Sequence, residues 1–202
     1  MSSRDEEGRV RQPTRRSLMK AERRQRLLDG AARLFAERGF RAVSIEDLAA
    51  DAGVSGPAVY RHFPSKEAIL ADLLVSVSQR LLDEGSTEAD GAADPHEALR
   101  RLISFHTEFA LRDRDLIRIQ DHDMASLAPA DAKSVSRLQR AYLEVWVTTL
   151  VRLESTVSES IARTKIHAVF GLLNSTPHSA RSADTEATRS VLEAMASTAL
   201  DL

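Results

Sequence analysis

The chain has 202 residues and no cysteine, which excludes a disulfide framework and thiolate chemistry. Its first 20 residues are polar and arginine-rich, and no stretch approaches the ~20 apolar residues of a membrane span. We therefore expect no signal peptide, no membrane partner and a cytoplasmic location. The formal net charge is −2, but residues 1–42 carry net +6 and the remaining 160 carry net −8. A basic end joined to an acidic remainder is typical of a protein that places one end against nucleic acid.

A polar arm and one long helix come first in the chain. Residues 1–17 have many charges and few apolar side chains, which predicts a disordered basic arm making weak, nonspecific DNA contacts. From Lys20 to Arg38 the apolar residues recur at helical spacing, and Gly39 closes the helix. These apolar residues are Leu27, Ala31, Leu34 and Phe35.

Residues 44–63 have the pattern of two short helices joined by a tight turn. Ser44 and Asp47 form a Ser-x-x-acid helix start, and Ile45, Leu48, Ala49 and Ala52 form one buried stripe. Gly53 suits the left-handed residue that follows a helix, and Ser55 is expected to cap the second helix. This order predicts a helix-turn-helix that binds DNA.

These motifs resemble the TetR family of bacterial regulators. The resemblance spans about residues 18–75 and is carried by residues 34–40, 44–49, 52–55 and 59–67. It implies an all-α fold of about nine helices, with a three-helix DNA-binding domain and a larger ligand-binding and dimerisation domain. We therefore expect a basic arm over residues 1–17, a DNA-binding domain over 18–64 and a second domain over 65–202.

The resemblance also implies a homodimer on a palindromic operator. One helix-turn-helix contacts about one half-site, whereas two held roughly 34–36 Å apart can recognise a palindrome. In the family the last two helices pair across a twofold axis. Here they offer Ile161, Ile166, Val169, Phe170, Leu173, Val191, Leu192, Met195, Ala196 and Leu200, some of which must instead form intrachain core.

The predicted DNA contacts divide into phosphate and base contacts. The resemblance and the exposed polarity indicate Ser44, Tyr60, His62 and Lys66 as phosphate ligands. Ser55, Gly56, Pro57 and Ala58 begin the second helix and would face base edges, where thymine methyl contact suits their small side chains. Arg41 precedes the motif and is predicted to enter the minor groove.

The remaining chain is predicted to be helical, without strands. After a helix capped by Ser65 and running to about Leu81, residues 84–94 are rich in Gly, Ala, Asp and Ser and are predicted to form a loop. Further helices are expected over 95–111, 115–127, 129–153, 158–176 and 185–200. Pro177 is expected to end the helix over 158–176.

Several polar residues lie out of place on the apolar faces of these helices. We predict a mostly apolar inducer cavity lined by His106, Phe109, Trp146, His167, Asn174 and His178. A metal site made by His106, His167, His178 and one residue of Asp121, His122 and Asp123 is the alternative. No two of these histidines show His-x3-His spacing, so we favour hydrogen-bonded histidines and predict neither metal nor cofactor.

The inducer class stays open between a lipophilic drug, an acyl thioester and a metabolite.

Two other functions compete with a ligand-responsive repressor. One is a helical metal- or ligand-binding enzyme, but the sequence shows no nucleophile with a nearby base and no phosphate loop. A metallohydrolase would need the His/Asp cluster to hold a metal with an open coordination position. A nonspecific DNA-coating protein would bind unrelated DNA equally well. We predict a repressor that is not an enzyme, because a dimer on its operator can block a promoter.

Overall fold

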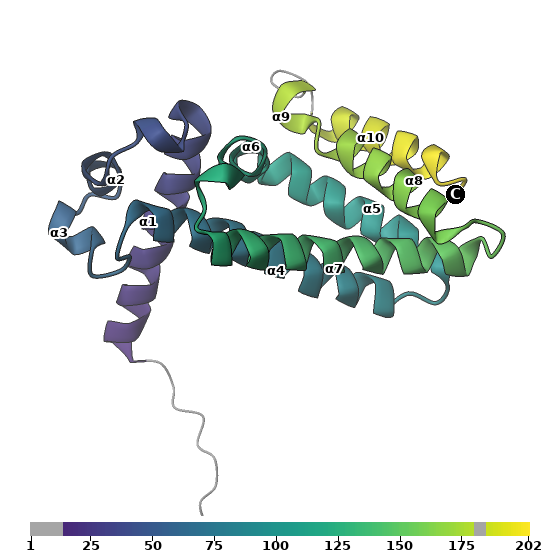
Figure 1. Cartoon of the computed structure of the whole chain (residues 1–202), viewed down its shortest axis with the longest axis horizontal. Helices are drawn as coiled ribbons and strands as arrows, with labels where there is room; N and C mark the ends of the chain where they lie inside the picture. Colours follow the sequence, from purple (N-terminus) through teal and green to yellow (C-terminus); the bar gives the residue numbers. More distant parts are fainter. Residues whose placement is uncertain (1–13, 180–184) are drawn as a thin grey trace, which may run out of the picture.

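The computed structural model describes residues 14–179 and 185–202, and within these ranges every regular element is helical (Figure 1). The predicted all-α fold is thus confirmed. The elements are α1 (Arg15–Arg38), η1 (Phe40–Ala42), α2 (Ile45–Asp51), α3 (Gly56–Val59), α4 (Lys66–Asp90), α5 (Pro95–Arg112), α6 (Arg114–Asp123), η2 (Met124–Ser126), α7 (Pro129–Leu153), α8 (Glu159–Leu173), α9 (Thr176–Ser179) and α10 (Thr185–Ala199).

Local signals in the sequence account for the helix-turn-helix. Ser44 and Asp47 form the predicted capping box, in which each side chain accepts a hydrogen bond from the backbone N–H of the other. Gly53 has a φ of +64°, as the turn requires. Ser55 occupies the N-cap of α3 but makes no capping hydrogen bond, so that part of the prediction is wrong.

Three helix boundaries of the body differ from the prediction, the first being that the helix expected over 115–127 ends at Asp123 and is followed by η2. Helix α4 continues to Asp90 through the expected loop, since Gly85 lies directly against the Tyr142 ring of α7 and leaves no room for a Cβ. Helix α8 ends at Leu173, and Pro177 lies in the first turn of α9. Backbone N–H groups in a first turn have no acceptor within the helix, so the missing N–H of proline costs nothing there.

The predicted disordered arm is partly helical. Thr14 caps α1, which begins at Arg15 rather than near Lys20, so residues 15–17 are helical. The remainder of that prediction, residues 1–13, lies outside the described residues.

The molecule has two apolar cores that share helix α4. We use "head" for residues 14–64 and "body" for the described residues from 65 onward. The N-terminal half of α4, with Ile69, Leu70 and Leu74, packs into the head core, and Val77 and Leu81 pack into the body core. Figure 1 shows α1–α3 at one end of the molecule and the bundle of α4, α5, α7, α8 and α10 at the other. Helix α4 therefore belongs to both parts, and α6 lies between them against α1.

No helix in the described ranges is both long and apolar enough to cross a membrane.

Candidate DNA-binding and ligand-binding sites

The start of α3 presents small, accessible groups, as the sequence predicts. Ser55 and Pro57 are exposed, Gly56 and Ala58 are half-buried, and the Ser55 hydroxyl has no capping bond to break. A Cβ added at Gly56 would meet no atom within 4 Å, so another chain can approach the backbone closely there. Tyr60, just after α3, is 56% exposed, and Arg41 is also exposed. These positions leave the predicted base and phosphate contacts sterically open.

Two of the predicted phosphate ligands are already engaged inside the head. Lys66 donates from Nζ to the carbonyl oxygens of Phe40 (2.8 Å) and Val43 (2.7 Å), and its ammonium lies 4.3 Å from the centre of the Phe40 ring. Two of its three donors therefore hold the η1 turn against α4, which leaves one donor for the predicted phosphate contact. The Ser44 hydroxyl donates to Asp47 Oδ2 at 2.6 Å within the capping box.

A basic groove beside α3 contains residues that the site prediction missed. Arg15, Lys20, Arg23 and Arg61 line it together with His62, and its volume is about 640 Å³. Burial lowers the pKa of His62, and the nearby positive charges of Lys20, Arg23, Arg24 and Arg61 lower it further. The His62 Nδ1 atom is buried without a hydrogen-bond partner among the residues that the structure describes. Such a surplus of positive charge favours an anion, and the run of basic residues in α1 was its signal in the sequence.

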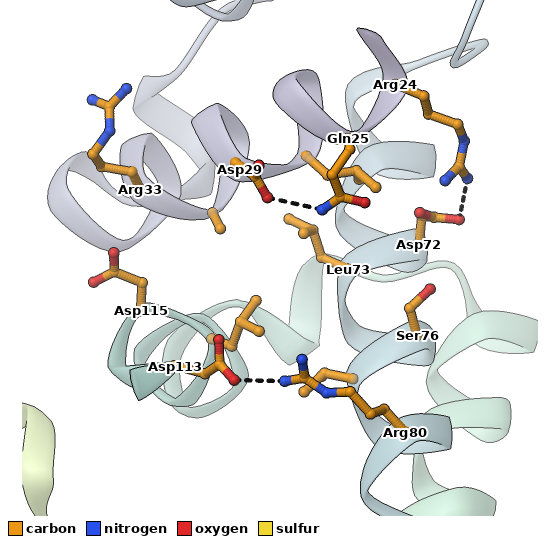
Figure 2. Close-up of a pocket in the computed structure, with 14 residues that line it drawn as sticks. Arg24, Gln25, Asp29, Arg33, Asp72, Leu73, Ser76, Arg80, Asp113 and Asp115 are labelled. Carbon is orange, nitrogen blue, oxygen red and sulfur yellow. Dashed lines mark hydrogen bonds and ion pairs between the residues drawn. The ribbon is translucent and has the colours of Figure 1, made fainter. Parts of the chain in front are cut away.

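A second groove lies at the junction of head and body, where α1, α4 and the α5–α6 corner meet (Figure 2). Arg24 of α1 pairs with Asp72 of α4 at 2.6 Å, and Arg80 of α4 pairs with Asp113 before α6 at the same distance. The two ion pairs join α4 to the head on one side and to α6 on the other. A shift of α4 relative to either neighbour must therefore change at least one of them.

Helix α6 also reaches the head through its last residue. Asp123 is buried, and its Oδ2 accepts a 3.4 Å hydrogen bond from the backbone N–H of Phe40 in η1. Asp121 and His122, the other two residues that the alternative metal site could use, are exposed. No group of three potential metal ligands occurs among the residues that the structure describes.

The body contains a cavity of about 490 Å³ between α4, α5, α6, α7 and α8. Four of the residues predicted to line an inducer cavity do line this one, namely His106, Phe109, His167 and Asn174. Trp146 does not, because its side chain is fully buried behind the cavity wall, 5.1 Å from Phe170 between ring centres. The side chain of His178 lies outside the described residues. The other lining residues are Leu81, Ile117, Gln120, Ser136, Gln139, Arg140, Tyr142, Leu143, Arg163 and Phe170.

His106 is the centre of a hydrogen-bonded relay in the wall of this cavity. Its Nε2 lies 3.1 Å from Asn174 Oδ1, and its Nδ1 lies 3.2 Å from the Tyr142 hydroxyl. Burial lowers the pKa of His106 to about 4, so the ring is neutral at pH 7. An amide oxygen only accepts, so Nε2–H donates to Asn174 and Nδ1 accepts from Tyr142. The relay fixes the Asn174 amide at the cavity without introducing a charge.

Three residues of the expected dimer surface are exposed on α8 and α10. Ile161, Val191 and Met195 are 52–56% exposed, which is unusual for large apolar side chains. Six others of that predicted set are buried inside the chain, namely Ile166, Val169, Leu173, Leu192, Ala196 and Leu200.

A helix-turn-helix with basic surroundings, carried on a larger helical body, defines a DNA-binding regulator. The chain matches the models of two protein families of this class. The profile of "Bacterial regulatory proteins, tetR family" matches residues 27–73, and that of "Tetracyclin repressor-like, C-terminal domain" matches residues 92–199, over half of the chain. The protein belongs to the TetR family, as the resemblance of its motifs predicts.

Individual relatives agree with this assignment. The HTH-type transcriptional repressor KstR2 of Rhodococcus jostii is 30% identical over 132 residues, 65% of each chain. The TetR-family regulator PfmR of Thermus thermophilus is 29% identical, with a TM-score of 0.77 over 87% of this chain and 97% of that one. A TetR-family regulator of Bordetella parapertussis shares the fold, with 23% identity and a TM-score of 0.80 over 88% and 94% of the two chains. The chain spans 65% or less of the length of the curated relatives that it matches.

Proposed function

We propose that the protein is a transcriptional repressor that binds a palindromic operator as a homodimer and is released by a small-molecule inducer, lipophilic or acyl-type in character. The observation that carries this proposal is the physical link between a DNA-binding head and a cavity in the body. The domain division at residues 18–64 and 65–202 is part of the proposal, with α4 as the shared helix. The repressor function of the relative KstR2 supports the direction of control.

In the head, the proposal assigns base contacts to Ser55, Gly56, Pro57 and Ala58 and phosphate contacts to Tyr60 and His62. The exposed start of α3 and the open space at Gly56 support the base contacts. The basic groove adds Arg15, Lys20, Arg23 and Arg61 as a second source of phosphate contacts. Arg41 keeps its proposed place in the minor groove because its side chain is exposed and can turn toward DNA.

In the body, α6 supplies a short route from the cavity to the head. Ile117 and Gln120 line the cavity, and Asp123, one turn beyond Gln120 on the same helix, contacts Phe40 in the head. A ligand that displaces α6 must therefore change the Asp123–Phe40 contact. Helix α4 lies on the other side of the cavity and would follow through the Arg80–Asp113 pair. Such a shift changes the separation of two heads in a dimer.

Selection from genomic DNA tests the operator. Purified protein is incubated with sheared genomic DNA of its source organism, and the retained fragments are sequenced. We expect a shared palindrome that is bound about 10³-fold or more tightly than unrelated DNA. Uniform retention would instead favour a DNA-coating function and contradict a specific regulator.

The exposed face of α8 and α10 is the proposed dimer interface. Its apolar Ile161, Val191 and Met195 support burial against a second copy. Val191→Glu places a charge in the middle of this face and should convert the dimer to a monomer in analytical ultracentrifugation, with loss of palindrome binding. Ala130→Glu, at an exposed position in the first turn of α7, is the matched control and should remain dimeric. A Val191→Glu protein that is still dimeric would place the interface elsewhere.

A further inference from the structure

The charges on the cavity wall differ from those of the surrounding body. The chain beyond residue 42 carries net −8, yet the described residues that line the cavity include Arg140 and Arg163 and no carboxylate. An arginine of this lining that is not held by a carboxylate would favour an anionic group on a ligand.

The two arginines are not equivalent. Arg163 is bound by Glu144 at 2.5 and 3.0 Å and by Glu159 at 2.7 Å, and these carboxylates raise its pKa. Arg140 is exposed, and although its charge lowers the pKa of Glu144, it makes no close ion pair with any residue that the structure describes. Arg163 is therefore held by two carboxylates, whereas the guanidinium of Arg140 is free to meet a ligand at the cavity surface.

Gln139, the residue before Arg140, adds a second donor to the same lining. Its Nε2 atom is buried and has no hydrogen-bond partner among the described residues. A buried amide donor without a partner lowers stability, and a ligand oxygen that accepts from it would recover this loss. A guanidinium and an amide N–H₂ on adjacent residues suit an oxygen-rich anionic group.

The inner wall cannot hold a charge. His106 is neutral, and its relay to Tyr142 and Asn174 contains no ionised group. Phe170 stacks on the His106 ring at 4.9 Å between ring centres, and Phe109 lies edge-on to it at 5.6 Å. A charge placed here would lose its hydration without gaining an ionic partner. The anionic end of a ligand must therefore lie at Arg140 and its apolar part must lie inside.

We propose that the ligand of this cavity is an anionic amphiphile, bound with its acidic head group at Gln139 and Arg140 and its apolar part against Leu81, Phe109, Ile117 and Leu143. This inference adds a ligand class to the proposed function. It rests on that function only where it calls the ligand an inducer. The apolar part lies beside Ile117 of α6, and the head group contacts α7. One molecule thus connects the helix that reaches Phe40 to a helix of the rigid bundle.

Three probes with straight chains of ten carbons and different head groups test this inference by calorimetry on the full-length protein without DNA. Decanoate, 1-decanol and decyltrimethylammonium are titrated below their micelle concentrations. We expect decanoate to bind about ten-fold more tightly than decanol, and the cation to bind more weakly than decanol. Arg140→Gln should remove the decanoate preference and leave decanol affinity unchanged. Arg137→Gln, an exposed arginine on α7 outside the cavity lining, is the matched control and should retain the preference.

Four results would overturn the inference: decanol binding as tightly as decanoate, the cation binding most tightly, a preference that survives in Arg140→Gln, or no saturable binding of any probe. Because no DNA is present, each result is independent of operator binding. Failure of the proposed function would instead appear as decanoate binding of the expected pattern to a protein that selects no palindrome or is not released from it.

Discussion

The head and the body of this protein are held together in different ways. In the head, polar contacts join residues that are close in the sequence, such as Ser44 with Asp47, and Lys66 holds η1 beside the apolar core. In the body, aromatic rings contributed by three helices pack around a buried histidine: His106, Tyr142, Trp146 and Phe170. The head thus adds local polar contacts to its apolar core, while the body core is centred on packed rings.

The largest expected effect tests ring packing in the body. Trp146 is fully buried, so Trp146→Ala should lower the free energy of unfolding by about 3–5 kcal/mol through lost burial and a cavity. Tyr60→Ala is the comparison in the head, where the ring is exposed and the expected change is close to zero. Denaturant titration measures both. A cost below about 1 kcal/mol for Trp146→Ala would mean that this ring lines the ligand cavity after all, as the sequence predicts.

The next effect tests whether Lys66 belongs to the head core or to DNA. Removing its ammonium in Lys66→Ala leaves two carbonyl groups without a charged donor, which should cost about 2–3 kcal/mol of stability. The salt dependence of DNA binding should stay unchanged at a temperature where the variant is folded. Arg61→Ala, at an exposed position in the basic groove, should show the reverse: unchanged stability and a salt slope smaller by about one. A reduced slope for Lys66→Ala would restore its predicted phosphate contact.

The third effect is a pH dependence that arises in the body. The pKa of His106 is about 4 in the folded protein, whereas the ordinary value of 6.5 applies to the unfolded chain. The unfolded chain therefore binds the proton first as the pH falls. The stabilisation by neutral His106 is complete above pH 6.5 and decreases as the pH falls toward 4. Between pH 7 and pH 5 the loss is about 2 kcal/mol.

The variant His106→Gln isolates this contribution, because it removes the titrating ring and leaves the other histidines in place. Its unfolding free energy should decrease less than that of the native protein between pH 7 and pH 5. His62, in the head, also has a lowered pKa and should add the same pH-dependent loss to both proteins. Parallel pH profiles for the two proteins would show that His106 is not buried as a neutral ring.

The sequence predicts those parts of the molecule whose structure depends on residues nearby in the chain. The capping box at Ser44, the turn at Gly53 and the bounds of α7 at Pro129 and Leu153 all follow from signals within a few residues, and the structure has them where predicted. The continuation of α4 past Gly85 was missed because its cause is Tyr142, a residue of another helix.

The binding sites show the same limit. The sequence identified His106 and Asn174 as out of place on apolar faces, but their hydrogen bond spans 68 positions and no spacing rule predicts it. Gln139 and Arg140 were missed because nothing in the surrounding sequence distinguishes them from the other polar residues of α7. The acceptors of Lys66 lie 26 and 23 positions earlier, which is why its role in the head core was not predicted.

The smallest expected effect on stability concerns the turn at Gly53 in the head, where an added side chain would not clash with its surroundings. At Gly53 an added Cβ would meet no atom within 4 Å, so Gly53→Ala is opposed only by the backbone angle of +64°. Because an L-residue with a side chain adopts this region at a cost of about 1–2 kcal/mol, we expect that loss of stability in denaturant titration. Gly56→Ala is the control, since its Cβ also meets no atom and its φ is not positive, and it should leave stability unchanged. Equal stabilities for the two variants would mean that the turn relaxes, and the separation between the helices of the head would then not be set by Gly53. Operator affinity would distinguish the two cases, because a relaxed turn displaces α3 from its place against α2 and lowers affinity even where stability is kept.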